Sequence, residues 1–510
     1  MSHVSNVPSL LDFLPLVPAQ RPEAEALLSQ FRSLSENQKG STRGSVLAKI
    51  FPLVFGENAH VEESSTYEEH RTQPWSTNCW LTPKVITTPS ATQEVAQILA
   101  LVRFLGATFS IRGGGHLQNP GFTSNDGGVV ISFSRFTQLD LSEDKTTVDV
   151  GLGLRWLEVY KGLEEHGLTV CGGRVPDVGV SGLLLGGGLS FQNSEHSLGC
   201  MNVVDYELVL ADSTITHANA SENPDLFWAL KGGGSNFGIV TRIRMTTIPN
   251  RIWAEGRVYA SAQNPDLIAA LMTYHQLIEK DNKASLIWHT LNESTLLIFL
   301  YCAPVEKPAV FSPFYDLPFL MNAVPPACMT VYQMVQGVAN ILAKEPLCHD
   351  MRTTTTLPSQ AVYLAAEKAR LEQVAALSDL ERADLTMVIQ PMSSLSVKVA
   401  HERGGNPLGL QAANHQWFLV MADYANISDE ERVRESVRKI VDAVEEAAKA
   451  EEGVYLPFKY SNYASRDQDP LASYGEDNLR KLKEIAARYD PEGVFQILQN
   501  GGWLLSTAGV

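Results

Sequence analysis

The chain has 510 residues, which is enough for two or three domains with a buried core. Its 44% hydrophobic and 19% charged residues are typical of a soluble globular protein, and they exclude disordered, collagen-like and coiled-coil proteins. The 57 acidic against 40 basic residues give a formal net charge of -17, which repels nucleic-acid phosphates and anionic lipids. We therefore expect no nucleic-acid partner and no membrane partner.

The start of the chain contains neither a basic segment nor an uninterrupted apolar run, and no stretch of 18 apolar residues occurs anywhere in it. The expected location is the cytoplasm, although N-x-S triplets leave secretion open. The six cysteines lie far apart without a C-x-x-C pair. The sequence therefore predicts neither a zinc cage nor a disulfide framework.

In chain order, residues 1–45 are expected to form a short helix and then a flexible lead-in, because the stretch ends in small and polar residues. A helix is predicted between Ser90, which makes a capping box with Gln93, and a terminal Gly106. Apolar residues recur between them at helical spacing: Val95, Ile98, Leu99 and Val102. An alternating strand over 107–111 follows and runs into a glycine turn.

Further strands are predicted at 129–133, at 148–150 and on both sides of the turn at Asp212, together with a helix over 156–163. This alternation predicts one compact unit that ends near Pro249. After it come strand-like runs (L-L-I-F-L-Y-C, W-F-L-V-M-A-D-Y) and long helices, one of them capped by Ser428, which predict a second domain.

Three glycine clusters lie at 113–115, 172–188 and 232–234. None has the G-x-G-x-x-G spacing of a dinucleotide-binding turn, and no P-loop occurs. Glycines often only mark tight turns, but three clusters close together expose backbone N–H groups that suit a pyrophosphate-bearing cofactor. His116 follows the first cluster directly. No second metal ligand stands within four residues of it, so we predict no metal there and keep the roles of nucleophile and hydrogen-bond donor.

The run I-R-G-G-G-H at 111–116 resembles the covalent-flavin loop of the berberine bridge enzyme-like (BBE-like) oxidases, which have a p-cresol methylhydroxylase type FAD-binding domain. Other motifs of that family are similar to V-P-D-V-G-V-S-G-L-L-L-G-G-G at 175–188, N-P-D-L-F-W-A-L-K-G-G-G-S-N-F-G-I-V-T at 223–241, and Y-S-N-Y with D-P-E-G-V-F-Q near the C-terminus. The resemblance implies an α+β fold of two domains. It places an N-terminal lead-in at 1–45, the FAD-binding domain at 46–250, an antiparallel-sheet substrate domain at 251–455 and a C-terminal return to the FAD domain at 456–510.

The resemblance also implies that FAD is bound covalently, through a bond from His116 to the 8α-methyl group of the flavin. The other cofactor-binding residues that it implies are Arg112, Gly113, Gly114, Gly115, Pro176, Asp177, Val178, Gly179, Gly182, Gly187, Gly188, Ile239 and Asn462. Many relatives have a second, cysteinyl link at the position of Val175. Because Cys171 lies four residues earlier, no cysteinyl link is expected. Val178 stands where the family controls dioxygen access, which favours an oxidase.

Oxidation of an alcohol or phenol requires a base besides the flavin. Tyr460 and Tyr463 of the Y-S-N-Y motif match the family's catalytic tyrosine, and the alternation of a strand predicts that one of them faces the substrate while the other packs. Gln411 matches the family position above the substrate. Its amide cannot accept a proton at ordinary pH, so it is expected to orient the substrate.

The predicted function is an FAD-dependent oxidase that transfers hydride from a small, hydrophobic natural product (an alcohol, phenol or amine) to FAD. Dioxygen then reoxidises the flavin and gives hydrogen peroxide. Two alternatives stay open: a flavin dehydrogenase with another acceptor, and a non-redox member of the fold that positions a substrate for cyclisation.

Overall fold

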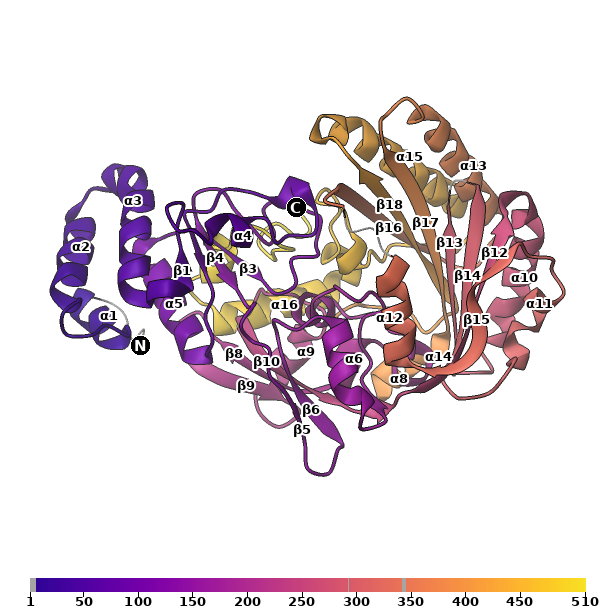
Figure 1. Ribbon diagram of the computed structural model, residues 1–510, viewed down its shortest axis with the longest axis horizontal. Coiled ribbons are helices and arrows are strands. Elements are labelled where there is room, and N and C mark those ends of the chain that lie inside the picture. The colour runs from indigo at the N-terminus through magenta and orange to yellow at the C-terminus, as the bar shows by residue number, and fades with distance from the viewer. Residues whose placement is uncertain (1–5, 292, 342–344) are drawn as a thin grey trace.

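The computed structural model describes residues 6–291, 293–341 and 345–510. The chain begins with three helices, α1 (Val7–Phe13), α2 (Arg21–Ser33) and α3 (Glu36–Phe55), which lie at one end of the molecule (Figure 1). The expectation of a flexible lead-in is wrong, because α3 runs through the polar stretch. Ser35 and Gln38 form a capping box at its start. Its apolar side is buried through Leu47, Ile50, Phe51 and Val54, so tertiary packing stabilises a segment of weak helix propensity.

The first sheet has the order β1-β2-β4-β3, and its last three strands are parallel. Its strands are β1 (Ala59–His60), β2 (Val85–Thr87), β3 (Phe109–Arg112) and β4 (Val129–Ser132). The predicted helix is confirmed as α5 (Thr92–Leu105), which ends at Gly106 in the left-handed conformation. The N-cap is Ala91 and not Ser90, although the backbone N–H of Ser90 donates to Glu94. The short helix α4 (Tyr67–Arg71) precedes β2.

The second sheet is antiparallel, in the order β5-β6-β10-β8-β9. It consists of β5 (Leu139–Leu141), β6 (Thr147–Gly151), β8 (Val203–Val209), β9 (Ile215–Asn219) and β10 (Ile239–Thr246). The helices of this part are α6 (Trp156–Glu164), α7 (Val180–Leu185), α8 (Asn193–His196) and α9 (Pro224–Leu230), and a small ribbon joins β7 (Leu168–Thr169) to β11 (Ile248–Pro249).

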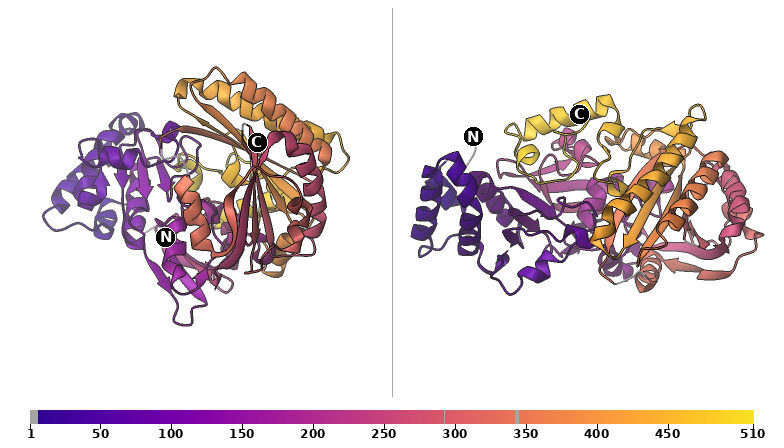
Figure 2. Two further views of the ribbon diagram at one scale, coloured as in Figure 1. Left: turned by 45° about the vertical axis from the view of Figure 1, so that its right-hand side comes forward. Right: turned by 90° about the horizontal axis from the view of Figure 1, so that it is seen from above.

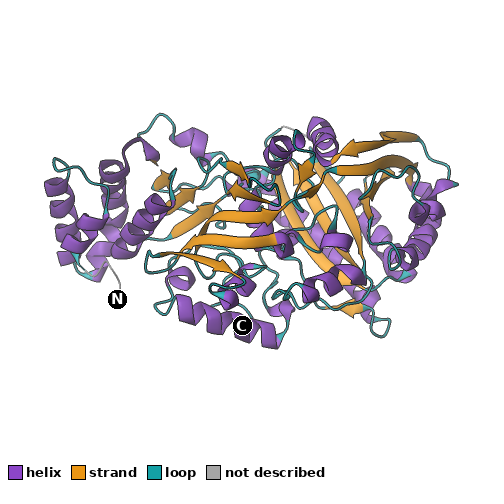
Figure 3. Cartoon of the chain, turned by 90° about the horizontal axis from the view of Figure 1, so that it is seen from below, coloured by secondary structure: helices purple, strands orange, loops and turns teal. Residues whose placement is uncertain are grey.

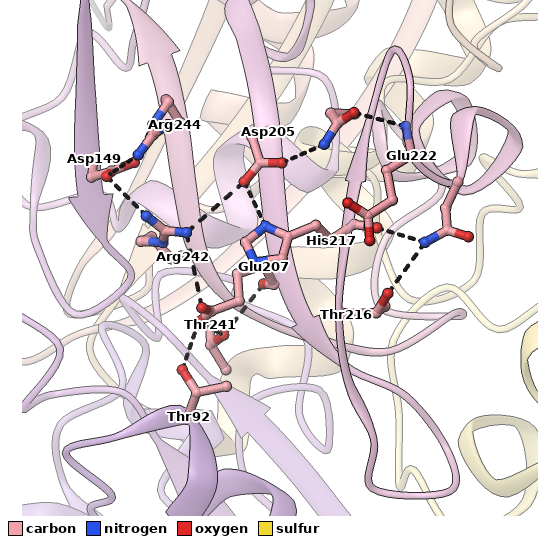
Figure 4. A network of polar contacts seen from close by, with 12 residues as sticks. Thr92, Asp149, Asp205, Glu207, Thr216, His217, Glu222, Thr241, Arg242 and Arg244 are labelled. Carbon is pink, nitrogen blue, oxygen red and sulfur yellow. Dashed lines mark hydrogen bonds and ion pairs between the residues drawn. The ribbon is translucent and has the colours of Figure 1, made fainter. Parts of the chain in front are cut away.

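Ion pairs connect neighbouring strands of the second sheet (Figure 4). The guanidinium of Arg242 lies 2.9 Å from Asp149, 4.0 Å from Asp205 and 3.9 Å from Glu207. His217 on β9 contacts Asp205 at 2.9 Å. These charges belong to four adjacent strands, β6, β10, β8 and β9, so the network fixes how the strands lie beside one another and takes no part in the cavity described below.

The third sheet has eight strands in the order β15-β12-β14-β13-β17-β18-β16-β19, and all its pairs are antiparallel. The strands are β12 (Arg251–Ala260), β13 (Ala284–Thr290), β14 (Ser294–Tyr301), β15 (Met321–Thr330), β16 (Cys348–Thr356), β17 (Ala383–Met392), β18 (His415–Tyr424) and β19 (Tyr455–Leu456). Three long helices and one short helix cover its outer face: α10 (Asn264–Leu277), α13 (Gln360–Ala376) and α15 (Glu430–Lys449), with the short α11 (Ser312–Tyr315) (Figures 1 and 3). On the other side α12 (Val331–Ile341) contacts α6, and α14 (Ser394–Glu402) contacts α8.

Side chains of the eight-stranded sheet alternate between two environments, as the pleat requires. One set packs into a separate core under the outer helices, for example Leu286, Trp288, Phe299, Ile389 and Phe418. The other set faces the half of the protein that contains the first two sheets, and it includes Ile287, Ile298, Val388 and Leu419. The inner face of this sheet therefore forms one wall of the interior of the protein.

The C-terminal segment returns to the first sheet (Figure 2, right). It contains α16 (Glu476–Tyr489), which contacts α9, and α17 (Val494–Ile497). The N–H of Phe109 donates to the carbonyl of Leu498 at 2.8 Å, and that of Asn500 donates to the carbonyl of Phe109 at 2.7 Å. The predicted α+β fold of two domains is confirmed. Over the described ranges, no helix is both long and apolar enough to span a bilayer.

Candidate active site

A cavity of about 1130 Å³ lies between the glycine loops of the first half and the inner face of the eight-stranded sheet. The loops line it through residues 113–117, 174–179 and 232–235, and the C-terminal segment lines it through residues 461–463. Residues far apart in the sequence therefore meet around one space.

The glycines allow two loops to approach one another closely. A Cβ atom on Gly114 would lie 2.5 Å from the backbone of Gly179, and one on Gly113 would lie 2.0 Å from Ser181 Oγ. Within the described part of the chain, the N–H groups of Gly113, Gly114 and Gly115 donate no backbone hydrogen bond. Free amide groups that line a long cavity suit the pyrophosphate of a dinucleotide such as FAD.

His116 lies in this cavity with its ring held on two sides. It stacks on Trp75, with ring centroids 4.2 Å apart, and Trp75 stacks in turn on His349 at 3.4 Å. The Nε2 atom of His116 is 3.4 Å from Oδ1 of Asp177. The guanidinium of Arg155 donates to the carbonyl oxygens of Gly114 and Asp177, so it ties the loop of His116 to the loop of Asp177.

The electrostatic surroundings keep Asp177 ionised. Burial raises its pKa, but the contact with His116 and the charge of Arg155 outweigh this effect and hold the pKa below its ordinary value. A carboxylate that accepts from Nε2–H of the imidazole leaves the lone pair of Nδ1 available for bond formation.

Comparison with known proteins agrees with this geometry. Residues 83–219 match the model of the FAD binding domain family. An FAD-dependent monooxygenase of Arthrobotrys oligospora is 35% identical over 508 residues, which cover 97% of this chain and 98% of that protein. The bifunctional solanapyrone synthase of Alternaria solani is 33% identical over 434 residues, 83% of this chain and 82% of that protein. BBE-like 1 of Physcomitrella patens has the same fold, with a TM-score of 0.74, 18% identity, and coverage of 88% of this chain and 97% of that one.

The chain belongs to the BBE-like family. It is an FAD-dependent oxidoreductase, and its cofactor is FAD. Most of the residues that the family motifs indicated line the cavity: the glycine loop with His116, the segment Pro176–Gly179, Gly182, Asn462 and Tyr463.

Four of the cofactor-binding residues assigned from the BBE-like motifs lie outside this lining. Ile239 is buried on β10, and its neighbours Gly238 and Val240 line the cavity in its place. Gly187 and Gly188 lie behind the loop, where the N–H of Gly188 donates to Tyr460. Arg112 is buried beneath the glycine turn, and none of its guanidinium nitrogens has a hydrogen-bond partner in the described structure. Burial, together with the charge of Arg155, lowers the pKa of Arg112 to about 10, so it stays charged at neutral pH.

The two tyrosines of the Y-S-N-Y motif have different environments. The hydroxyl of Tyr460 accepts from the N–H groups of Gly188 and Leu189, both at 3.0 Å, and its ring stacks on Trp417. Burial raises the pKa of Tyr460. Tyr463 lines the cavity. The segment is a short 3-10 helix, Ser461–Tyr463, and not the predicted strand, but one tyrosine does face the cavity while the other packs.

The expected position of Gln411 above the substrate is wrong. Gln411 is exposed on the loop between α14 and β18 and does not line the cavity. Gln390 on β17 lies next to the site but outside the cavity lining, and it accepts a hydrogen bond from Arg174. The match between residues 401–411 and the family motif was too weak to fix the register of the strands.

Sequence reasoning also missed Arg174 and His289, which both line the cavity. Arg174 precedes the V-P-D run in the same loop, so its position next to a recognised motif was a usable signal. His289 lies on a long strand of the second domain, where no local pattern marks it. Burial and the charge of Arg174 lower the pKa of His289 to about 4, so its imidazole is neutral at neutral pH.

In the described structure the second glycine loop places no cysteine in the lining of the cavity. Val175 lines the cavity, whereas Cys171 is fully buried and does not reach it. Burial also raises the pKa of Cys171 to about 12, so the thiolate needed for attack on the flavin is scarce at neutral pH.

Proposed function

We propose that this enzyme is an oxidase whose FAD is attached covalently through His116 alone. The observation that carries the proposal is the position of His116 in the cavity, with Asp177 at Nε2 and with valine, not cysteine, at position 175. The bound flavin would supply the acceptor for a hydride. The glycine loops and the amide groups of residues 113–115 would hold its pyrophosphate and ring.

Within this proposal Tyr463 takes the proton of the substrate's oxygen or nitrogen atom. It is the motif tyrosine that faces the cavity, and the guanidinium of Arg174 donates to its hydroxyl at 3.0 Å. This hydrogen bond fixes the position of the phenol hydroxyl at the cavity surface, where a base must meet the substrate. Tyr460 is assigned a supporting role, because its hydroxyl already accepts two backbone N–H groups.

The substrate that we propose is a small, hydrophobic natural product with an oxidisable alcohol, phenol or amine. The cavity wall formed by the eight-stranded sheet supports this, since Ile287, Ile298, Val388, Leu419 and Met421 are all apolar. The similarity to the solanapyrone synthase of Alternaria solani supports a role in secondary metabolism.

Two measurements test the proposal. Protein that is precipitated with acid should stay yellow, because a covalent flavin is not released. Oxygen consumption and peroxide release, screened over small phenols, alcohols and amines, should identify a substrate that yields one peroxide for each oxidised molecule. Flavin reduction without peroxide would indicate a dehydrogenase, and product formation without flavin reduction would indicate a non-redox enzyme.

A further inference from the structure

A polar cluster interrupts the apolar wall of the cavity. Its members are Arg174 from the second glycine loop and Tyr463 from the C-terminal segment, which line the cavity, and Gln390 from β17, which contacts both of them but lies outside the lining. Nη2 of Arg174 donates to the hydroxyl of Tyr463 at 3.0 Å and to Oε1 of Gln390. The hydroxyl of Tyr463 lies 3.4 Å from the same Oε1 atom. The cluster thus joins three separate parts of the chain.

The positive charge of Arg174 has no counter-ion in the described protein. Three carboxylates line the cavity, but each has another partner: Asp177 contacts His116, Glu158 accepts from the backbone of Arg155, and Glu345 pairs with Arg382. A guanidinium is always charged, and holding its charge in a cavity without a counter-ion is unfavourable. A ligand with a negative charge would remove that cost.

The cluster also has hydrogen-bond donors to spare. Only Nη2 of Arg174 donates to described residues, which leaves the donors on Nε and Nη1. The side chain of Gln390 is 2% exposed, and its Nε2 atom has no hydrogen-bond partner. The nearby His289 is neutral at ordinary pH, so it does not compete with Arg174 for an anion. Unused donors around an unpaired cation are what an anionic oxygen atom needs.

Combining the cluster with its apolar surroundings, we infer that Arg174, held in position by Gln390, binds a delocalised anionic oxygen, an ionised enol or a carboxylate, on an otherwise apolar substrate. This inference rests on the proposed function for the site's role, and it narrows the substrate class to acidic natural products. Tyr463 remains free to take a proton from the carbon-bound hydroxyl or amine that is oxidised elsewhere on the same molecule.

The test is a binding titration of the FAD-loaded protein by calorimetry, without turnover and without oxygen. The probes are 4-hydroxy-6-pentyl-2-pyrone, which is ionised at neutral pH, its 4-O-methyl ether, and decanoate. The wild-type protein should bind an ionised probe at least tenfold more tightly than the ether. Preference for the pyrone would assign the enolate, and preference for decanoate would assign the carboxylate.

Arg174→Gln should weaken binding of the preferred ionised probe about 30-fold or more and leave the affinity for the ether within threefold. Arg174→Lys should recover part of the loss, and Arg251→Gln, which removes an exposed charge on β12, should change nothing. Equal binding of the ether and both ionised probes by the wild-type protein would overturn the inference even if no variant folded. Equal weakening of all probes in Arg174→Gln would also overturn it. Because the titration involves no redox step, failure of the oxidase proposal would show only in the peroxide assay.

Discussion

The imidazole of His116 and the carboxylate of Asp177 lie side by side in the cavity, with Nε2 3.4 Å from Oδ1. They come from two different glycine loops, which Arg155 ties together. An ionised Asp177 favours the tautomer in which Nε2 carries the proton and Nδ1 carries the lone pair. Trp75 stacks on the ring and limits its rotation. In our account this arrangement prepares His116 for its bond to the flavin.

Asp177→Asn is expected to slow covalent attachment about tenfold or more. An amide does not stabilise a charged imidazole, and it selects the tautomer of His116 less firmly than a carboxylate does. The measurement is the time course of flavin fluorescence on a denaturing gel after FAD is added to apoprotein. Asp140→Asn, on the exposed part of β5, is the matched control. Attachment at the wild-type rate in Asp177→Asn would show that the carboxylate is not needed.

His116→Ala should bind FAD only non-covalently, since it removes the one nucleophile that our account uses. All the flavin should then pass through a filter after denaturation. Cys171→Ser should keep its flavin bound, because that thiol is buried away from the cavity. Loss of the covalent flavin in Cys171→Ser would mean that the loop is arranged differently.

Tyr463→Phe is expected to slow flavin reduction by about 10²- to 10⁴-fold, the usual contribution of a general base. Anaerobic stopped-flow reduction with an identified substrate measures this. In Tyr460→Phe the N–H groups of Gly188 and Leu189 lose their acceptor, so the free energy of unfolding should fall by about 1–3 kcal/mol. The rate of flavin reduction should change much less in this variant than in Tyr463→Phe. The reverse pattern would transfer the catalytic role to Tyr460.

Acid should destabilise the protein through His275. Its ring is 3% exposed and contacts Asn414 and Tyr363, and burial lowers its pKa from 6.5 to about 4. The unfolded state therefore binds the proton more readily than the folded state. The stabilisation is complete above pH 6.5 and is lost as the pH falls toward 4, by about 2 kcal/mol at pH 5.

Urea unfolding at pH 8 and pH 5 tests the role of this histidine. The variant His275→Gln should lose less stability between the two pH values than the wild-type protein, by about the same 2 kcal/mol. His166→Gln, a surface histidine beside Glu165, serves as control. If His275→Gln and the wild-type protein lose equal stability, another group causes the acid sensitivity.

Local sequence patterns were sufficient to predict the elements in which residues interact with others close to them in the sequence. The helix that ends at Gly106, the strand that runs into the glycine turn and the position of His116 all depend on residues within one turn or loop. Gln411 was misplaced because register in a large antiparallel sheet is decided by pairing between distant strands. The same pairing places His289 at the cavity and Gln390 beside Arg174, and no motif marks either residue.

The N-terminal helices illustrate a second limit. The polar stretch within α3 has glycines and small residues that favour a loop by propensity. It is helical because the residues that follow it are buried against the rest of the protein, including Leu47 and Phe51. Such a contribution from tertiary packing is not visible in a local window.

The central claim is that His116 carries the flavin and carries it alone. Mass spectrometry of a tryptic digest tests it most directly, since cleavage after Arg112 gives a peptide of residues 113–135 and cleavage after Lys161 gives a peptide of residues 162–174. The account predicts the flavin mass on peptide 113–135, at His116, and unmodified Cys171 in peptide 162–174. Flavin on peptide 162–174, or complete release of flavin from the denatured wild-type protein, would contradict it.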